Sequence, residues 1–208
     1  MVTDMSSALA YCHEDIYKYC MDRDSDNLNS DPVDFGKLII DDATRSRLID
    51  KYKVIHNDIH SRKIMRRENG DFVLLGFDIA IEGNVVLVSS DRNRFGAVEY
   101  MPPEKWNVED VLTTQSDIYS FGVVMYEYLT GRVPFKSEGI SISEMTKLHE
   151  EVTVKHLIPS IFEMRRKSYE AKYPGQKYVK DYPDWLEKAI LKCLEKNPDD
   201  RFKNGREL

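Results

Sequence analysis

The 208-residue sequence has no long apolar run and no excess of basic residues. No apolar stretch approaches the roughly 18 residues that a membrane-spanning helix requires. Residues 1–10 contain Asp4 but no basic residue, unlike a secretory signal. The 30 lysines and arginines are outnumbered by 36 acidic residues, which disfavours general nucleic-acid binding because phosphates attract basic surfaces. We therefore expect a cytoplasmic protein that binds neither membranes nor nucleic acid.

Cysteine is also scarce in this chain. Cys12, Cys20 and Cys193 are its three cysteines, so any disulfide scheme leaves one unpaired, and their spacing matches no metal site. This usage is typical of a reducing compartment and predicts that all three are structural. The length and a hydrophobic content of 41% suffice to bury the core of one domain.

Polar side chains suited to acid–base or metal chemistry gather in residues 54–80. Two segments rich in Ile, Val, Leu and Phe flank turn signals in this stretch, which predicts short strands beside polar loops. The first loop carries His56, Asp58 and His60. At this alternating spacing the three side chains share one face of an extended segment, an arrangement that could serve a metal-dependent hydrolase.

The residues before this stretch predict short elements rather than a core. Residues 8–21 predict a short helix, with a Tyr-rich strand as the alternative for its end, and residues 22–34 predict a polar connector. Residues 35–52 predict one or two short helices capped by Asp41, Asp42 or Thr44.

The strongest helix is predicted over residues 114–130, after a small strand at 84–89 and a turn fixed by two prolines at 102–103. Thr114 and Asp117 form a capping-box pattern, and Gly131 is placed to stop the helix. Its apolar residues lie on nearly every face, which predicts a buried helix at the centre of the core. Gly122 in its middle predicts that another backbone passes close by.

Further helices are predicted near residues 143–149, 159–173 and 183–194, the last two with Pro at the first turn. In the last, residues from Trp185 to Leu194 recur at helical spacing and predict one buried face. The sequence then ends as another helix is expected to begin, at Gly205.

Four ordered segments resemble motifs of one family. His56-Asn57-Asp58-Ile59 resembles the H-R-D-L catalytic loop, and Tyr100-Met101-Pro102-Pro103-Glu104 resembles the A-P-E region. Asp117-Ile118-Tyr119-Ser120-Phe121-Gly122 resembles the start of the central helix of the C-terminal lobe. The segment 193–202 resembles the family's late C-x-x-x-x-P-x-x-R-P element. Together they resemble the C-terminal lobe of a eukaryotic-type, serine/threonine-like protein kinase.

This resemblance implies an α+β fold, predominantly α, built as a kinase-like C-lobe around a central buried helix. It implies a C-lobe over residues 54–208, and residues 1–53 as short helices and a remnant of the N-lobe and hinge. The N-lobe is thus expected to be rudimentary or missing. No Gly-x-Gly-x-x-Gly phosphate cover and no Val-Ala-Ile-Lys strand precede the loop.

The resemblance also implies roles for single residues. Glu104 and Arg201 would form the buried ion pair that ties the A-P-E turn to the end of the lobe. Asp117 would accept hydrogen bonds from the backbone of the catalytic loop, with the helix cap as its alternative. His56 would pack against the turn after the second strand. Asp58 would accept the proton of a substrate hydroxyl.

Several positions depart from the family pattern. Lys63 stands where the family has the metal-binding Asn, so a cation replaces a metal ligand. Gly76 stands at the aspartate of the D-F-G motif, and Asp78 lies two residues later. His60 replaces the loop lysine of serine/threonine kinases, and Ala97 replaces the threonine of the G-T-x-x-Y pattern.

The leading hypothesis is a catalytically impaired, pseudokinase-like scaffold for binding or regulation. The alternative is an active ATP-dependent serine/threonine kinase, in which Asp58 is the base, Asp78 holds Mg²⁺ and Lys63 clamps phosphate. A metal-dependent hydrolase that uses His56, Asp58 and His60 is a remote third possibility. A C-lobe without its partner lobe should expose apolar surface, so we expect a protein partner or a homodimer.

Overall fold

Helices dominate the part of the chain that the computed structural model describes, residues 1–16, 41–83, 97–105, 111–135, 144, 147 and 160–208. Its α-helices are α1 (Val2–Ala10), α3 (Asp42–Tyr52), α4 (Thr114–Thr130), α7 (Ile161–Lys172) and α8 (Asp184–Cys193). Its strands are β1 (Val54–Ile55), β2 (Ile64–Arg66), β3 (Phe72–Leu74) and β4 (Ile81–Glu82). Short helical turns are η1 (Tyr11–Asp15), η2 (Ser61–Lys63), η3 (Val98–Tyr100), η4 (Pro103–Lys105) and η5 (Pro198–Asp200). This content agrees with an α+β fold in which helices predominate.

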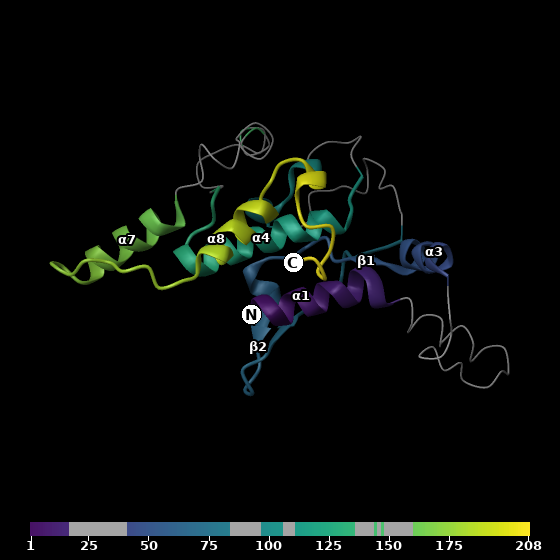
Figure 1. Ribbon diagram of the computed structural model, residues 1–208, viewed down its shortest axis with the longest axis horizontal. Coiled ribbons are helices and arrows are strands. Elements are labelled where there is room, and N and C mark those ends of the chain that lie inside the picture. The colour runs from purple at the N-terminus through teal and green to yellow at the C-terminus, as the bar shows by residue number, and fades with distance from the viewer. Residues whose placement is uncertain (17–40, 84–96, 106–110, 136–143, 145–146, 148–159) are drawn as a thin grey trace.

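Helix α4 occupies the middle of the molecule, with α8 running along it and α1 below it (Figure 1). It ends as expected, because Gly131 adopts the left-handed conformation, with φ 72°, that stops a helix. The capping box joins Thr113 and Ser116, so the predicted pairing of Thr114 with Asp117 is wrong. The reason is that Thr113, with its extended backbone, is the residue that precedes the first helical turn. Asp117 is therefore free for contacts outside the helix.

Helix α4 is buried on nearly every side, as its apolar pattern predicts. Fully buried residues include Ile118, Tyr119, Phe121 and Val123. Tyr128 departs from the pattern because its side chain is 66% exposed. At Gly122 a Cβ atom would lie 2.6 Å from Cβ of Cys193, so the glycine admits side chains of α8 rather than another backbone.

Helix α1 shares this core. Met5 and Leu9 are fully buried and belong to the same apolar cluster as the residues of α4. The helix begins at Val2, earlier than predicted, and continues into the π-turn η1 (Tyr11–Asp15). Residues on both sides of position 53 therefore pack in one apolar cluster. The strand considered for the end of residues 8–21 and the connector at 22–34 lie outside the described residues.

Two small antiparallel ladders hold the loops between them. Strand β1 pairs with β4 through Ile55 and Ile81. Strand β2 pairs with β3, with Met65 opposite Val73. The ladders position the central loop (residues 56–63) and the second turn (residues 75–80) side by side. The strand predicted at residues 84–89 lies outside the described part of the chain.

Helix α3 lies at the edge of the molecule (Figure 1) and buries none of its residues. Its cap was correctly predicted, because Asp41 accepts a hydrogen bond from the backbone N–H of Thr44 at 2.9 Å. This lack of buried residues agrees with the prediction that the segment has too few apolar residues on one face to form a core alone.

Helices α7 and α8 occur where they were predicted, but their end residues and the buried face of α8 differ from the prediction. Helix α8 begins after Pro183 and buries Ile190 and Cys193, whereas Trp185 is 59% exposed, contrary to the predicted buried face. The final residues, from Gly205, form a turn instead of the expected helix. Only positions 144 and 147 of the helix predicted near 143–149 are described, and both are helical. No described helix is both long and apolar enough to cross a membrane.

Candidate functional site

Asp117 binds the backbone of the central loop from the first turn of helix α4. Its carboxylate, which is 1% exposed, accepts hydrogen bonds from the N–H groups of His56 at 2.7 Å and Asn57 at 2.9 Å. A third partner is Nε2 of His13 in η1, at 3.0 Å. Of the two roles considered for Asp117, the structure shows the loop contact, while Thr113 and Ser116 form the cap.

Asn57 holds the loop in an unusual conformation. Its φ of 64° lies in the left-handed region, which asparagine tolerates better than most residues. The side-chain amide donates a hydrogen bond to the carbonyl of Ile79 at 3.0 Å, and Lys105 Nζ donates one to the carbonyl of Asn57 at 2.8 Å. With the bond from its N–H to Asp117, Asn57 is thus held by three hydrogen bonds, through its N–H, its side chain and its carbonyl.

His56 is fully buried and uses both ring nitrogens within the protein. Nε2 lies 3.0 Å from the carbonyl oxygen of Leu75, and Nδ1 accepts the backbone N–H of Asp58 at 3.3 Å. The ring also meets the edge of Phe77, with centroids 4.5 Å apart. His56 thus ties the loop to the second turn, and neither nitrogen is left to bind a metal.

His60 points at Asp58, with 3.7 Å between Nε2 and the carboxylate. Burial lowers the pKa of His60, although the charge of Asp58 acts in the opposite direction. Within the described residues, no group of three or more His, Cys, Asp or Glu side chains is arranged to hold a metal. The hydrolase reading of His56, Asp58 and His60 is therefore wrong for this arrangement, because His56 is already committed to the loop.

Lys63 places its ammonium group between two carboxylates. Nζ lies 3.0 Å from Asp78 Oδ2 and 3.6 Å from Asp58 Oδ2. The hydrogen bond with Asp78 is the main cause that raises the pKa of Lys63, and the same bond lowers the pKa of Asp78. The residues expected to serve as base and as metal ligand therefore share one ammonium group.

Gly76 makes room for this ammonium. Its φ of 78° favours glycine, and a Cβ atom at this position would lie 2.2 Å from Nζ of Lys63. A side chain at position 76 and Lys63 in its present place are therefore incompatible.

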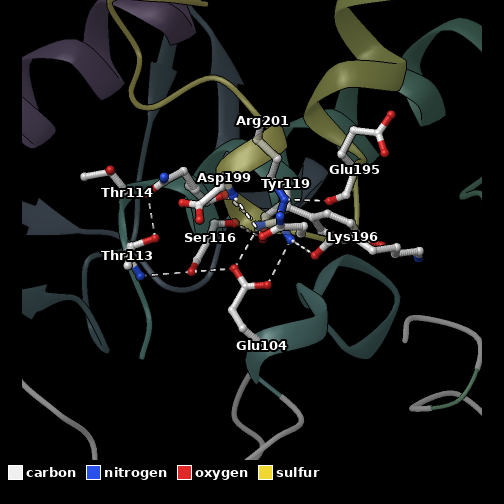
Figure 2. Close-up of polar contacts among 12 residues, drawn as sticks. Glu104, Thr113, Thr114, Ser116, Tyr119, Glu195, Lys196, Asp199 and Arg201 are labelled. Carbon is white, nitrogen blue, oxygen red and sulfur yellow. Dashed lines mark hydrogen bonds and ion pairs between the residues drawn. The ribbon is translucent and has the colours of Figure 1, made fainter. Parts of the chain in front are cut away.

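Glu104 and Arg201 form a buried ion pair beside the first turn of helix α4 (Figure 2). Two guanidinium nitrogens bind the two carboxylate oxygens at 2.8 and 2.9 Å. Ser116 Oγ donates a further hydrogen bond to Glu104 at 2.8 Å. Through this network η4, the start of α4 and the segment after α8 are joined, as the sequence resemblance implied.

The described motifs agree with a comparison against protein families. The protein kinase domain model matches residues 47–205, which is more than half of the chain. This chain belongs to the protein kinase domain family.

Individual kinases match over much of the chain. A probable serine/threonine-protein kinase of Clostridium acetobutylicum is 29% identical over 180 residues, which cover 85% of this chain and 24% of that protein. The serine/threonine-protein kinase PrkC of Bacillus subtilis is 27% identical over 157 residues, covering 75% of this chain and 21% of that protein. A mitogen-activated protein kinase kinase of Pyricularia oryzae, MST7, is 31% identical over 153 residues, covering 73% and 33%. The aligned part of the chain therefore spans about a fifth to a third of the length of these kinases.

Protein kinases generally use ATP with Mg²⁺ held by the D-F-G aspartate and the loop asparagine. In this kinase domain those two positions are Gly76 and Lys63, and neither supplies an oxygen ligand of the kind that Mg²⁺ requires. The ammonium of Lys63 already lies against Asp58 and Asp78, the carboxylates nearest to that place. The residues present do not fit the metal ion.

Two residues of the site were not foreseen from the sequence of this kinase domain. His13 reaches Asp117 from a position 104 residues away, and no spacing pattern connects them. Lys105 lines the same small pocket as Asp58, with Tyr100 and Ser120. Burial lowers the pKa of Lys105 to about 8, although the charge of Asp58 opposes this shift. Lys105 directly follows Glu104, so the A-P-E resemblance was the only signal near it.

Proposed function

We propose that this kinase domain is a catalytically impaired pseudokinase that acts as a binding or regulatory scaffold. The observation that carries the proposal is the position of the Lys63 ammonium, within 3.0 Å of Asp78 and 3.6 Å of Asp58. Asp58, the base of the alternative active kinase, is thereby paired with a cation. Asp78, the metal ligand of that alternative, accepts a hydrogen bond from the same cation.

Phosphoryl transfer depends mainly on positioning and on charge stabilisation by metal ions and cationic side chains. The loop backbone keeps its position through Asp117, whereas the metal positions have changed to Lys63 and Gly76. None of the ten glycines forms a Gly-x-Gly-x-x-Gly cover upstream of the loop. A preserved scaffold with altered chemistry supports a binding function over a catalytic one.

The packing supports a C-lobe architecture for this domain. In the part of the chain that is described, the strands form only two two-stranded sheets around the loops. Helix α1 buries Met5 and Leu9 in the core of α4, which supports assigning it to the same lobe rather than to an N-lobe remnant.

An exposed apolar surface supports binding to a protein partner or to a second copy. Met65, Leu75 and Phe77 are 50%, 42% and 43% exposed. They lie on β2 and on the second turn, within two residues of Lys63 or Gly76 in the sequence. Large apolar side chains that cluster on a surface commonly mark interaction sites.

Nucleotide binding and phosphotransfer test the proposal. Calorimetric titration with ATP should show no binding that depends on Mg²⁺, and incubation with labelled ATP should show no transfer to the chain or to a generic protein substrate. Transfer that Asp58→Asn abolishes and Asp50→Asn preserves would establish the active-kinase alternative. Asp50 is a suitable control because it is an exposed aspartate that pairs with Lys53 away from the loop.

A further inference from the structure

The backbone of Lys63 is fixed next to the second turn, and its side chain crosses that turn to reach Asp78. Its backbone N–H donates to the carbonyl of His60 at 2.9 Å, and its own carbonyl accepts from the N–H of Leu75 at 2.8 Å. These bonds fix the end of η2 against the start of the second turn. The side chain then lies over Gly76, where a Cβ atom would approach to within 2.2 Å of Nζ.

We propose that Lys63 and Gly76 form an interdependent pair that builds a resident cation into this site in place of a metal ion. This inference rests on the proposed function in one respect, that the native chain does not use a divalent cation here. The ammonium lies within 3.0 and 3.6 Å of Asp78 and Asp58, and Asp58 is only 14% exposed. A partly buried carboxylate needs a nearby positive charge, and Lys63 supplies it permanently.

The two residues depend on each other for steric reasons as well as for charge. An aspartate at position 76, as the family pattern has, collides with Lys63 unless the lysine leaves. If Lys63 leaves, Asp58 and Asp78 lose their shared positive charge. A variant without Lys63 should therefore recruit a free cation, and an added aspartate at position 76 should complete an oxygen-rich site for a divalent ion.

The experiment compares four chains: native, Lys63→Asn, Gly76→Asp and the double variant. Each is melted with Mg²⁺ and with a chelator, and each is titrated with Mg²⁺ alone by calorimetry. The native melting temperature should not respond to Mg²⁺. Lys63→Asn should melt lower and regain stability with Mg²⁺, and the double variant should bind Mg²⁺ at least about tenfold more tightly than the native chain. Lys63→Gln repeats the single-variant measurement with more of the lysine stem retained.

Coupling between the two positions is the second readout. Gly76→Asp should lower the melting temperature more in the native background than beside Lys63→Asn, because the collision with the lysine side chain is then absent, while the strain at φ 78° is present in both. Lys180→Asn is the matched control: Lys180 and its partner Asp184 are 29% and 82% exposed, against 23% and 80% for Lys63 and Asp78. The control variant should not gain a response to Mg²⁺.

Three results would overturn the inference. They are a native chain that Mg²⁺ stabilises as much as it stabilises Lys63→Asn, equal behaviour of Lys63→Asn and Lys180→Asn, or an equal cost of Gly76→Asp in both backgrounds. These outcomes concern stability and metal binding in variants. They are therefore distinguishable from failure of the proposed function, which would appear as phosphotransfer by the native chain.

Discussion

Replacing Arg201 with Met should be among the most destabilising single substitutions in this domain. The guanidinium is buried, with the residue 3% exposed, and all five of its N–H groups have partners. Two reach Glu104, and the others reach the carbonyl oxygens of Gln115, Glu195 and Lys196 at 2.7 to 2.9 Å. Arg201→Met keeps an apolar stem of similar length but removes every one of these donors.

The expected loss follows from what remains buried after the change. Glu104 keeps the hydrogen bond from Ser116 but loses its counter-charge, and three carbonyl groups lose a donor. Removing one partner of a buried ion pair typically lowers the free energy of unfolding by about 3–5 kcal/mol. Each kcal/mol lowers the melting temperature of a domain of this size by roughly 2–4 °C. We therefore expect the melting temperature to fall by roughly 6–20 °C.

Urea unfolding followed by circular dichroism measures this loss. The double variant Glu104→Met/Arg201→Met should recover part of it, because neither charge is then left unpaired. Arg166→Met is the control, since Arg166 pairs with Glu163 and Glu170 on the half-exposed face of α7 and should matter far less. If Arg201→Met shifts the unfolding midpoint no more than Arg166→Met does, the reasoning from burial is refuted.

Three further substitutions test other parts of the structure. Asp117→Asn should lower the free energy of unfolding by about 2–3 kcal/mol, because its amide NH₂ would face one of the two loop N–H groups. Hydrogen exchange should show faster exchange of those two amides, and unchanged rates would contradict the anchoring role. Gly122→Ala should cost about 1–3 kcal/mol despite the better helix propensity of Ala, because its Cβ meets Cys193 at 2.6 Å. Thermal melting measures this cost, and a neutral or stabilised variant would show that α8 moves aside freely. The lowered pKa of Lys105, about 8 against an ordinary 10.5, means that the unfolded chain binds more protons between these values. The free energy of unfolding should therefore rise with pH across this window, and it should rise less in Lys105→Met. Urea midpoints measured at several pH values test this. Equal slopes of the midpoint against pH in the native chain and the variant would exclude the effect.

The main elements of the fold were predictable because their signals are local. Helix α4 was predicted correctly from its apolar pattern and from Gly131, which supplies the left-handed stop. The face of α8 was predicted only in part. Periodicity indicates that one side of a helix is apolar, but it does not show whether another element covers a residue such as Trp185.

The site was less predictable because its contacts join distant residues. Asp117 had two possible roles, and only the approach of the loop, 60 residues earlier in the sequence, decides between them. The direction of the Lys63 side chain was equally open from the sequence. The active-kinase alternative assigned Asp78 to the metal ion and Lys63 to phosphate, and only the structure showed that these two side chains lie 3.0 Å from each other.

The sequence by itself determined the family and the central buried helix. It also showed that oxygen ligands are missing at positions 63 and 76. These properties depend on residue identity and on periodicity along the chain. Only the tertiary structure decided that Lys63 occupies the space left by Gly76 and that His13 completes the contacts of Asp117. The physical reason is that packing brings together charges and empty volumes from segments far apart in sequence. Local sequence patterns contain no information about the distances between such segments.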